Sequence, residues 1–128
     1  YVDAVTGLGD LLDAIKKAAT KGFIKSIDGR KVNVDSPHKA LNYLLQSGAG
    51  VIAKRWMVIN QETMREAKIC ASQLGFIHDE LQFECAPEHI GDLSTSLVYS
   101  ATAAGEYYNM RIRIDAEATH GNNWSETH

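Results

Sequence analysis

Long apolar runs and cysteines are scarce in this 128-residue chain. No apolar stretch reaches the roughly 18 residues that a membrane-spanning helix needs, so we expect no membrane partner. The two cysteines, Cys70 and Cys85, form no C-x-x-C pair and are too few for a disulfide scaffold, which favours reduced thiols. The sequence also lacks a G-x-x-x-x-G-K-[ST] phosphate loop and a G-x-G-x-x-G turn. Small-molecule enzyme classes that a short local motif would identify therefore find no support.

Charge is unevenly distributed along the chain. The net charge of −3 argues mildly against a nucleic-acid partner. Residues 1–55, however, hold nine Lys and Arg against five Asp and Glu, whereas residues 56–128 hold four against eleven. A solvated surface is one interpretation, and the other is a face that attracts a polyanion beside a separate acidic site for cations. Six basic residues fall in one short stretch: Lys16, Lys17, Lys21, Lys25, Arg30 and Lys31.

The first half of the chain predicts a helix, a hairpin and a second helix. Apolar residues have helical spacing over 7–21, and two short strands then flank Asp28-Gly29, the preferred pair for a two-residue type I′ turn. Ser36 as N-cap and Pro37 at the first helical position begin the second helix. Its mid-helix "SGAG" suggests close approach of another backbone or a ligand. The buried stripe is expected to comprise Leu41, Leu44, Leu45, Gly48 and Ile52.

The second half predicts a helix capped by Asn60 and ending near Gln73, then a hairpin over 75–85 with "HDE" as its turn. Pro87 opens another helix, and "RIRIDAEA" at 111–118 alternates like a strand. Together the elements predict an antiparallel α+β fold, with helices packed on sheet hairpins. The core stripe expected for the helix after Pro87 is Ile90, Leu93, Leu97, Ala101 and Ala104.

Two sets of polar side chains are candidate site residues. Asp79 and Glu80, at the hairpin turn, must be solvated, paired or metal-bound, because burying an unpaired carboxylate is costly. His38, Asn42 and Gln46 recur every four residues on one helical face and offer neutral hydrogen-bonding groups, which suit base edges and sugars better than a metal. Taken alone, each set also fits a merely solvated surface.

Four segments, in this order, resemble the C-terminal part of family A DNA polymerases, the DNA polymerase I type, and particularly bacteriophage replicative members. They are "GFIKSIDGRKV", "SPHKALNYLLQSGAG", "IHDELQFE" and "GNNWSETH". The resemblance spans nearly the whole chain. It implies that residues 1–128 form a C-terminal segment of the palm subdomain, working in the cytoplasm of a phage-infected bacterial cell.

For the "HDE" turn, the resemblance implies a role in two-metal nucleotidyl transfer from deoxynucleoside triphosphates. Asp79 would be one of two aspartates that bind both catalytic Mg²⁺ ions, and Glu80 would be an acidic supporter. His78 would lie near the primer terminus. The C-terminal His128 would be a neighbour of the active site, as in phage members.

For primer–template DNA, the resemblance implies two contact regions. Gln46, Asn42 and His38 would face the minor groove and the sugars near the growing end. Arg30 and Lys31, on the basic hairpin, would touch the phosphate backbone.

Several parts of a complete polymerase of this family are missing: the earlier motif with the second metal-binding aspartate, the fingers, the exonuclease domain and most of the thumb. We therefore expect the chain alone to be inactive and to need the remainder of the polymerase. Apolar surface that would face the missing parts predicts self-association. The sequence fits both a fragment, proteolytic or engineered, and the product of a split gene.

Two other function classes remain open. A non-enzymatic α+β interaction domain would keep its function after Asp79→Asn. A stand-alone metal-dependent phosphodiesterase would need a second carboxylate cluster near Asp79, for which Glu84, Asp115 and Glu117 are the candidates.

Overall fold

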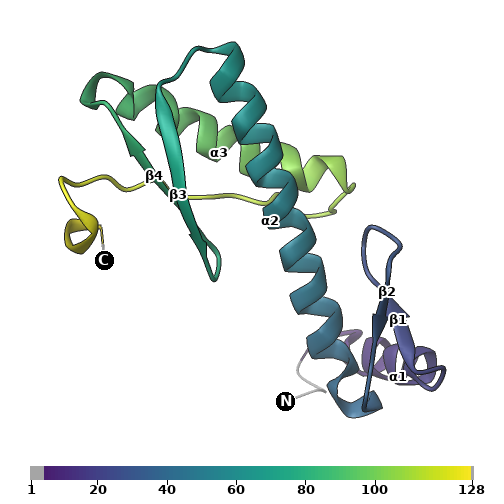
Figure 1. Ribbon diagram of the computed structural model, residues 1–128. Coiled ribbons are helices and arrows are strands. Elements are labelled where there is room, and N and C mark those ends of the chain that lie inside the picture. The colour runs from purple at the N-terminus through teal and green to yellow at the C-terminus, as the bar shows by residue number, and fades with distance from the viewer. Residues whose placement is uncertain (1–4, 128) are drawn as a thin grey trace. The chain divides into compact units, whose positions relative to one another are not determined.

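The computed structural model describes residues 5–127 and divides the chain into two compact units, Tyr1–Val51 and Ile52–His128 (Figure 1). Each unit contains one antiparallel two-stranded sheet together with helical segments. The predicted α+β class is therefore confirmed. No helix within the described residues is long and apolar enough to cross a membrane.

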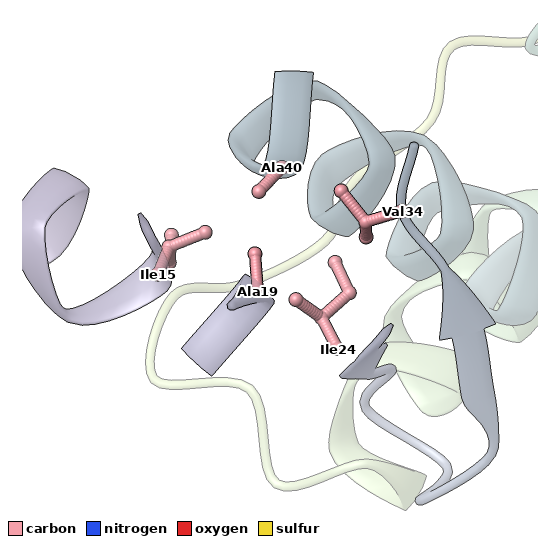
Figure 2. Packing of buried hydrophobic residues seen from close by; sticks show 5 residues of the cluster. All are labelled: Ile15, Ala19, Ile24, Val34 and Ala40. Carbon is pink, nitrogen blue, oxygen red and sulfur yellow. The ribbon is translucent and has the colours of Figure 1, made fainter. Parts of the chain in front are cut away.

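The first unit is built from α1 (Leu8–Ala19), β1 (Phe23–Lys25), β2 (Lys31–Asn33) and the start of α2 (Ala40–Glu66). A 3-10 turn that begins at Pro37 leads into α2, so the predicted helix start is confirmed. Apolar side chains from these elements pack together, which fixes the hairpin against both helices (Figure 2). The core residues of this unit are Ile15, Ala19, Ile24, Val34 and Ala40.

The turn of the β1–β2 hairpin differs from the sequence prediction. Ser26 N donates to Arg30 O, and Gly29 N donates to Ser26 O, both at 2.9 Å, so the loop has three residues. Gly29 has φ 83°, whereas Asp28 keeps a negative φ. A type I′ turn needs positive φ at both central residues. The predicted type I′ turn is therefore wrong, and the geometry is a type I turn followed by a glycine bulge.

The long helix α2 overturns the prediction that Asn60 begins a new helix. Asn60 lies inside α2, which continues to Glu66. The helix stops where Lys68 takes φ 56° and Ile69 N donates to Met64 O at 2.9 Å, the pattern of a Schellman C-cap. Residues 71–73, predicted to be helical, consequently belong to a strand.

The small residues in the first half of α2 have no close neighbour backbone among the described residues. A Cβ on Gly48 would lie 3.8 Å from Ile27 Cγ2, which is ordinary contact, and a Cβ on Gly50 would meet nothing within 4 Å. Leu45 is 62% exposed, so its assignment to the buried stripe is wrong. Within this stretch Gly48 is buried beside Ile27 and Gly50 is half-buried, so the small residues pack against side chains and not against another backbone.

The second unit contains β3 (Ala71–Ile77), β4 (Glu80–Cys85) and α3 (Ile90–Tyr107), which follows a 3-10 turn at Pro87–His89. The predicted stripe of α3 is confirmed at Leu93, Ala101 and Ala104, which are buried. The core of this unit consists of Met64, Ile69 and Leu93, packed against Ala71, Phe83, Cys85 and Leu97.

Residues 111–118 form no strand ladder in the structure, so the strand predicted there is wrong. The segment instead lies against α3, where Thr102 Oγ1 donates to Ile114 O at 3.0 Å. Gly105 permits this contact, because a Cβ there would lie 2.6 Å from Ile114 Cγ1. Alternation selects an extended backbone, but a ladder also needs a neighbouring strand.

Candidate functional site

The turn of the β3–β4 hairpin presents the predicted carboxylates to solvent. Ile77 pairs with Glu80, so the turn consists of His78 and Asp79, and Glu80 is the first residue of β4. The Asp79 carboxylate makes no hydrogen bond or ion pair within residues 5–127. Glu80 Oε1 accepts a hydrogen bond from Gln82 Nε2 at 2.9 Å. Of the two carboxylates, Asp79 is the one left open to a ligand.

His78 takes an unusual backbone conformation. Its φ of 56° lies in the left-handed region that favours glycine, while Asp79 keeps a negative φ. Positive φ at the first central residue alone matches the type II′ turn of two-residue hairpins, but it costs a non-glycine residue about 1 kcal/mol. Such strain is frequent at functional sites. Lys68 and Asn109 have similar φ values, 56° and 52°, so the conformation of His78 identifies a tight turn and does not by itself identify a site.

The carboxylates of this turn can supply only some of the ligands that a magnesium ion needs. Mg²⁺ is usually held by one or two carboxylates together with water and substrate phosphates, and the exposed Asp79 can supply one such oxygen donor. No group of three or more His, Cys, Asp or Glu suitable for a metal occurs in the part of the chain that the structure describes. In particular, Glu84, Asp115 and Glu117 do not assemble with Asp79 into the cluster that a stand-alone phosphodiesterase would need.

The second candidate set lies in the first unit. His38 is in the 3-10 turn, and Asn42 and Gln46 follow on α2. All three side chains are exposed, and none makes a hydrogen bond within the described ranges. Their donors and acceptors are therefore available to a ligand.

Beside His38, a small polar network fixes the approach to α2. Asp35 Oδ2 accepts from Lys39 Nζ at 3.3 Å, and Asp35 Oδ1 accepts from the Tyr43 hydroxyl at 3.1 Å. The hydrogen bond from Lys39, and after it the one from Tyr43, hold the pKa of the Asp35 carboxyl below its usual range.

Because the pKa of Asp35 is lowered on folding, its contribution to stability is present above its unfolded-state pKa and is lost as the pH falls through the folded-state value. We expect Tyr43→Phe to shift the carboxyl titration of Asp35 upward, towards the ordinary range. Carbon-detected NMR titration of the chain measures this shift. An unchanged Asp35 titration would contradict the assigned hydrogen bond.

The basic hairpin carries charge that is only partly matched. Arg30 Nε lies 2.7 Å from Asp28 Oδ2. Lys31 Nζ lies 4.6 Å from the ring centroid of Phe23. Lys31 also pairs directly across the hairpin with Lys25, so two lysines project from neighbouring positions. The predicted phosphate contacts would therefore come from Lys31 without competition from a carboxylate, and from Arg30 in competition with Asp28.

Sequence reasoning missed Gln82, whose amide holds Glu80. The two residues are two apart on β4 and so share a face, which was the only available signal. Near the last described residues, the Glu126 carboxylate accepts hydrogen bonds from Asn122 N at 2.8 Å and from Asn123 Nδ2 at 2.9 Å, and these bonds close a compact turn. His128, the predicted neighbour of the active site, lies outside the described residues.

Comparison with known proteins gives concordant results. Residues 5–126 match the model of DNA polymerase family A. The DNA-directed DNA polymerase of Enterobacteria phage T3 is 38% identical over 113 residues, which cover 83% of this chain and 16% of that protein. The corresponding polymerase of Escherichia phage T7 is 35% identical with the same coverage. The chain thus spans about a sixth of the length of these relatives.

A solved structure supports the same relationship. The POL domain of Pol1 from M. smegmatis, in complex with DNA primer-template and dNTP, is 26% identical with a TM-score of 0.74. The similarity covers 81% of this chain and 21% of that chain. Since the family model covers nearly all of the residues and the fold agrees with it, the chain belongs to DNA polymerase family A.

Proposed function

We propose that this chain is the C-terminal palm segment of a DNA-directed DNA polymerase and supplies the last catalytic motif, His78-Asp79-Glu80. The observation that carries the proposal is the exposed, unpaired Asp79 at a strained two-residue turn, in a chain that belongs to this family. Because the chain covers 16% of its phage relatives, the activity would be that of an assembly with the remaining polymerase. The chain alone would be inactive.

At the turn, each side chain has a separate task. Asp79 would hold Mg²⁺ through its free carboxylate, and Glu80, oriented by Gln82, would add negative charge beside it. The chemistry that Mg²⁺ supplies when bound is a lower pKa for the primer 3′-hydroxyl and neutralisation of charge on the triphosphate. His78 would contact the primer terminus from the neighbouring position of the turn.

Primer–template DNA would be recognised without reading its sequence. The minor groove offers hydrogen-bond acceptors at similar positions in every correct base pair. The exposed His38, Asn42 and Gln46 can donate to these acceptors and to sugars. Arg30 and Lys31 would bind phosphates and so position the duplex.

Primer extension by a reconstituted polymerase tests the proposal. The reconstituted polymerase is a fusion of all 128 residues to the part of the phage T3 polymerase that this chain does not match. With Mg²⁺ and four deoxynucleoside triphosphates, we expect extension by the reconstituted polymerase and none by the chain alone. A folded fusion without activity would overturn the proposed function. Robust extension by the chain alone would overturn its predicted inactivity.

Within the same enzyme, we expect Gln46→Ala to lower kcat/KM for extension by about 10-fold, which corresponds to the loss of one hydrogen bond to DNA of roughly 1.4 kcal/mol. Gln61→Ala is the matched control, because Gln61 is also an exposed glutamine of α2 and lies outside the candidate site. Equal kinetics for the two variants would remove Gln46 from the proposed DNA contacts.

A further inference from the structure

Strand β3 contains one residue more than its partner. Gln73 pairs with Phe83 and Gly75 pairs with Gln82, so Leu74 has no partner on β4 and forms a β-bulge. The side chain of Leu74 is 65% exposed, so core packing does not account for the extra residue. A bulge bends its strand and increases the local right-handed twist.

The bulge divides the hairpin into two parts. The base is anchored, because Ala71, Phe83 and Cys85 pack against the core of the second unit. Beyond Leu74, three residue pairs and the His78-Asp79 turn form an arm that is mostly exposed. Figure 1 shows this turn as the end of the hairpin that extends away from α3. The direction of the arm is therefore determined where the bulge lies.

The bulge also changes which face each residue of β3 occupies. Gln73 opposes Phe83, and Phe76 opposes Leu81, so Gln73 and Phe76 share a face although they are three residues apart. In a regular strand, residues three apart point to opposite faces. On that face, Gln73 Nε2 contacts Met57 Sδ of α2 at 3.1 Å. The direction of β3 therefore changes at Leu74, between the base and the arm of the hairpin.

We infer that the backbone bulge at Leu74 is a positioning element that directs the Asp79 turn. This inference rests on the proposed function, because it assigns the bulge to the geometry of the same site. The bulge would act by placing Asp79, and the Leu74 side chain itself would touch no reacting atom. A displacement of about 1 Å at a reacting centre can cost about 100-fold in rate, so we expect a change in the twist of the strand that carries the turn to lower the rate.

Deleting Leu74 tests the inference, because all six residue pairs and the turn could then form a regular ladder. In the reconstituted polymerase, we expect the deletion to lower kcat by about 10- to 100-fold and to leave KM for primer–template within about 2-fold. Leu74→Ser, which keeps the extra residue and removes only an exposed side chain, should retain wild-type kcat. A residue needed only for folding would not produce this split between kcat and KM.

The folded state of each variant is checked by hydrogen exchange at 71–73 and 83–85, the base of the hairpin. If the deletion loses protection there, insertion of one glycine after Leu74, which enlarges the bulge, is the deciding variant and should lower kcat similarly. Wild-type kcat in a folded deletion or insertion variant would overturn the inference. Extension that persists after Asp79→Asn would instead overturn the proposed function.

Discussion

Asp79→Asn should abolish primer extension by the reconstituted polymerase, with a fall in kcat of about 1,000-fold or more, or roughly 4 kcal/mol of transition-state stabilisation. Asparagine has nearly the same shape, so the His78-Asp79 turn can form as before. The neutral amide, however, removes the one unpaired carboxylate of the turn and leaves a poor ligand for Mg²⁺. Steady-state kinetics over a range of Mg²⁺ concentrations would measure the loss.

Folding should be unaffected by this substitution, because the side chain is exposed and makes no hydrogen bond within residues 5–127. An unchanged melting temperature is therefore the first control. Asp115→Asn is the second, since Asp115 is an exposed aspartate of the same unit whose hydrogen bond to Ala116 N an amide oxygen can replace. Extension that survives Asp79→Asn would favour a non-enzymatic interaction domain.

The hairpin with Asp79 was predictable because its signals are local. Three ionisable residues interrupt two apolar runs, and Leu81 and Phe83 alternate with polar residues on β4. The start of β3 was not predictable in this way. The helix before it ends at Glu66, and the chain then turns at Lys68, whose left-handed conformation glycine or asparagine would have signalled and lysine does not. The bulge at Leu74 leaves one local sign, Gly75, because a glycine inside a strand often marks a bulge.

Pairing between distant segments was the main information that the sequence did not contain. The alternation at 111–118 favours a strand, but residues 111 and 112 form a bend, 113–118 have no regular secondary structure, and no neighbouring strand pairs with them within residues 5–127. Asn60 is a second residue whose role depends on a distant segment. Asparagine is preferred at N-caps, yet here its partner is Ser96, 36 positions away in α3.

Asn60 also gives the largest expected effect on stability. It is 1% exposed, its Oδ1 accepts from Ser96 Oγ at 2.8 Å, and its Nδ2 contacts Met64 Sδ at 3.1 Å. Asn60→Leu should lower the free energy of unfolding by about 2–3 kcal/mol, because Ser96 would remain buried without its acceptor. Urea denaturation of the chain measures the change. Gln61→Leu, at the exposed neighbouring position, should change it by less than about 0.5 kcal/mol.

The double variant Asn60→Leu/Ser96→Ala separates the hydrogen bond from the shape of the buried site. Removing both polar partners should recover part of the loss, since an apolar pair leaves no unsatisfied group, and the coupling energy should be about 1 kcal/mol or more. Additive effects of the two substitutions would contradict the assigned bond. The contact joins α2 to α3, and α3 contributes Leu93 to the core that anchors the β3–β4 hairpin. We therefore expect Asn60→Leu to weaken hydrogen-exchange protection at the base of the hairpin that carries Asp79, although Asn60 has no part in the chemistry.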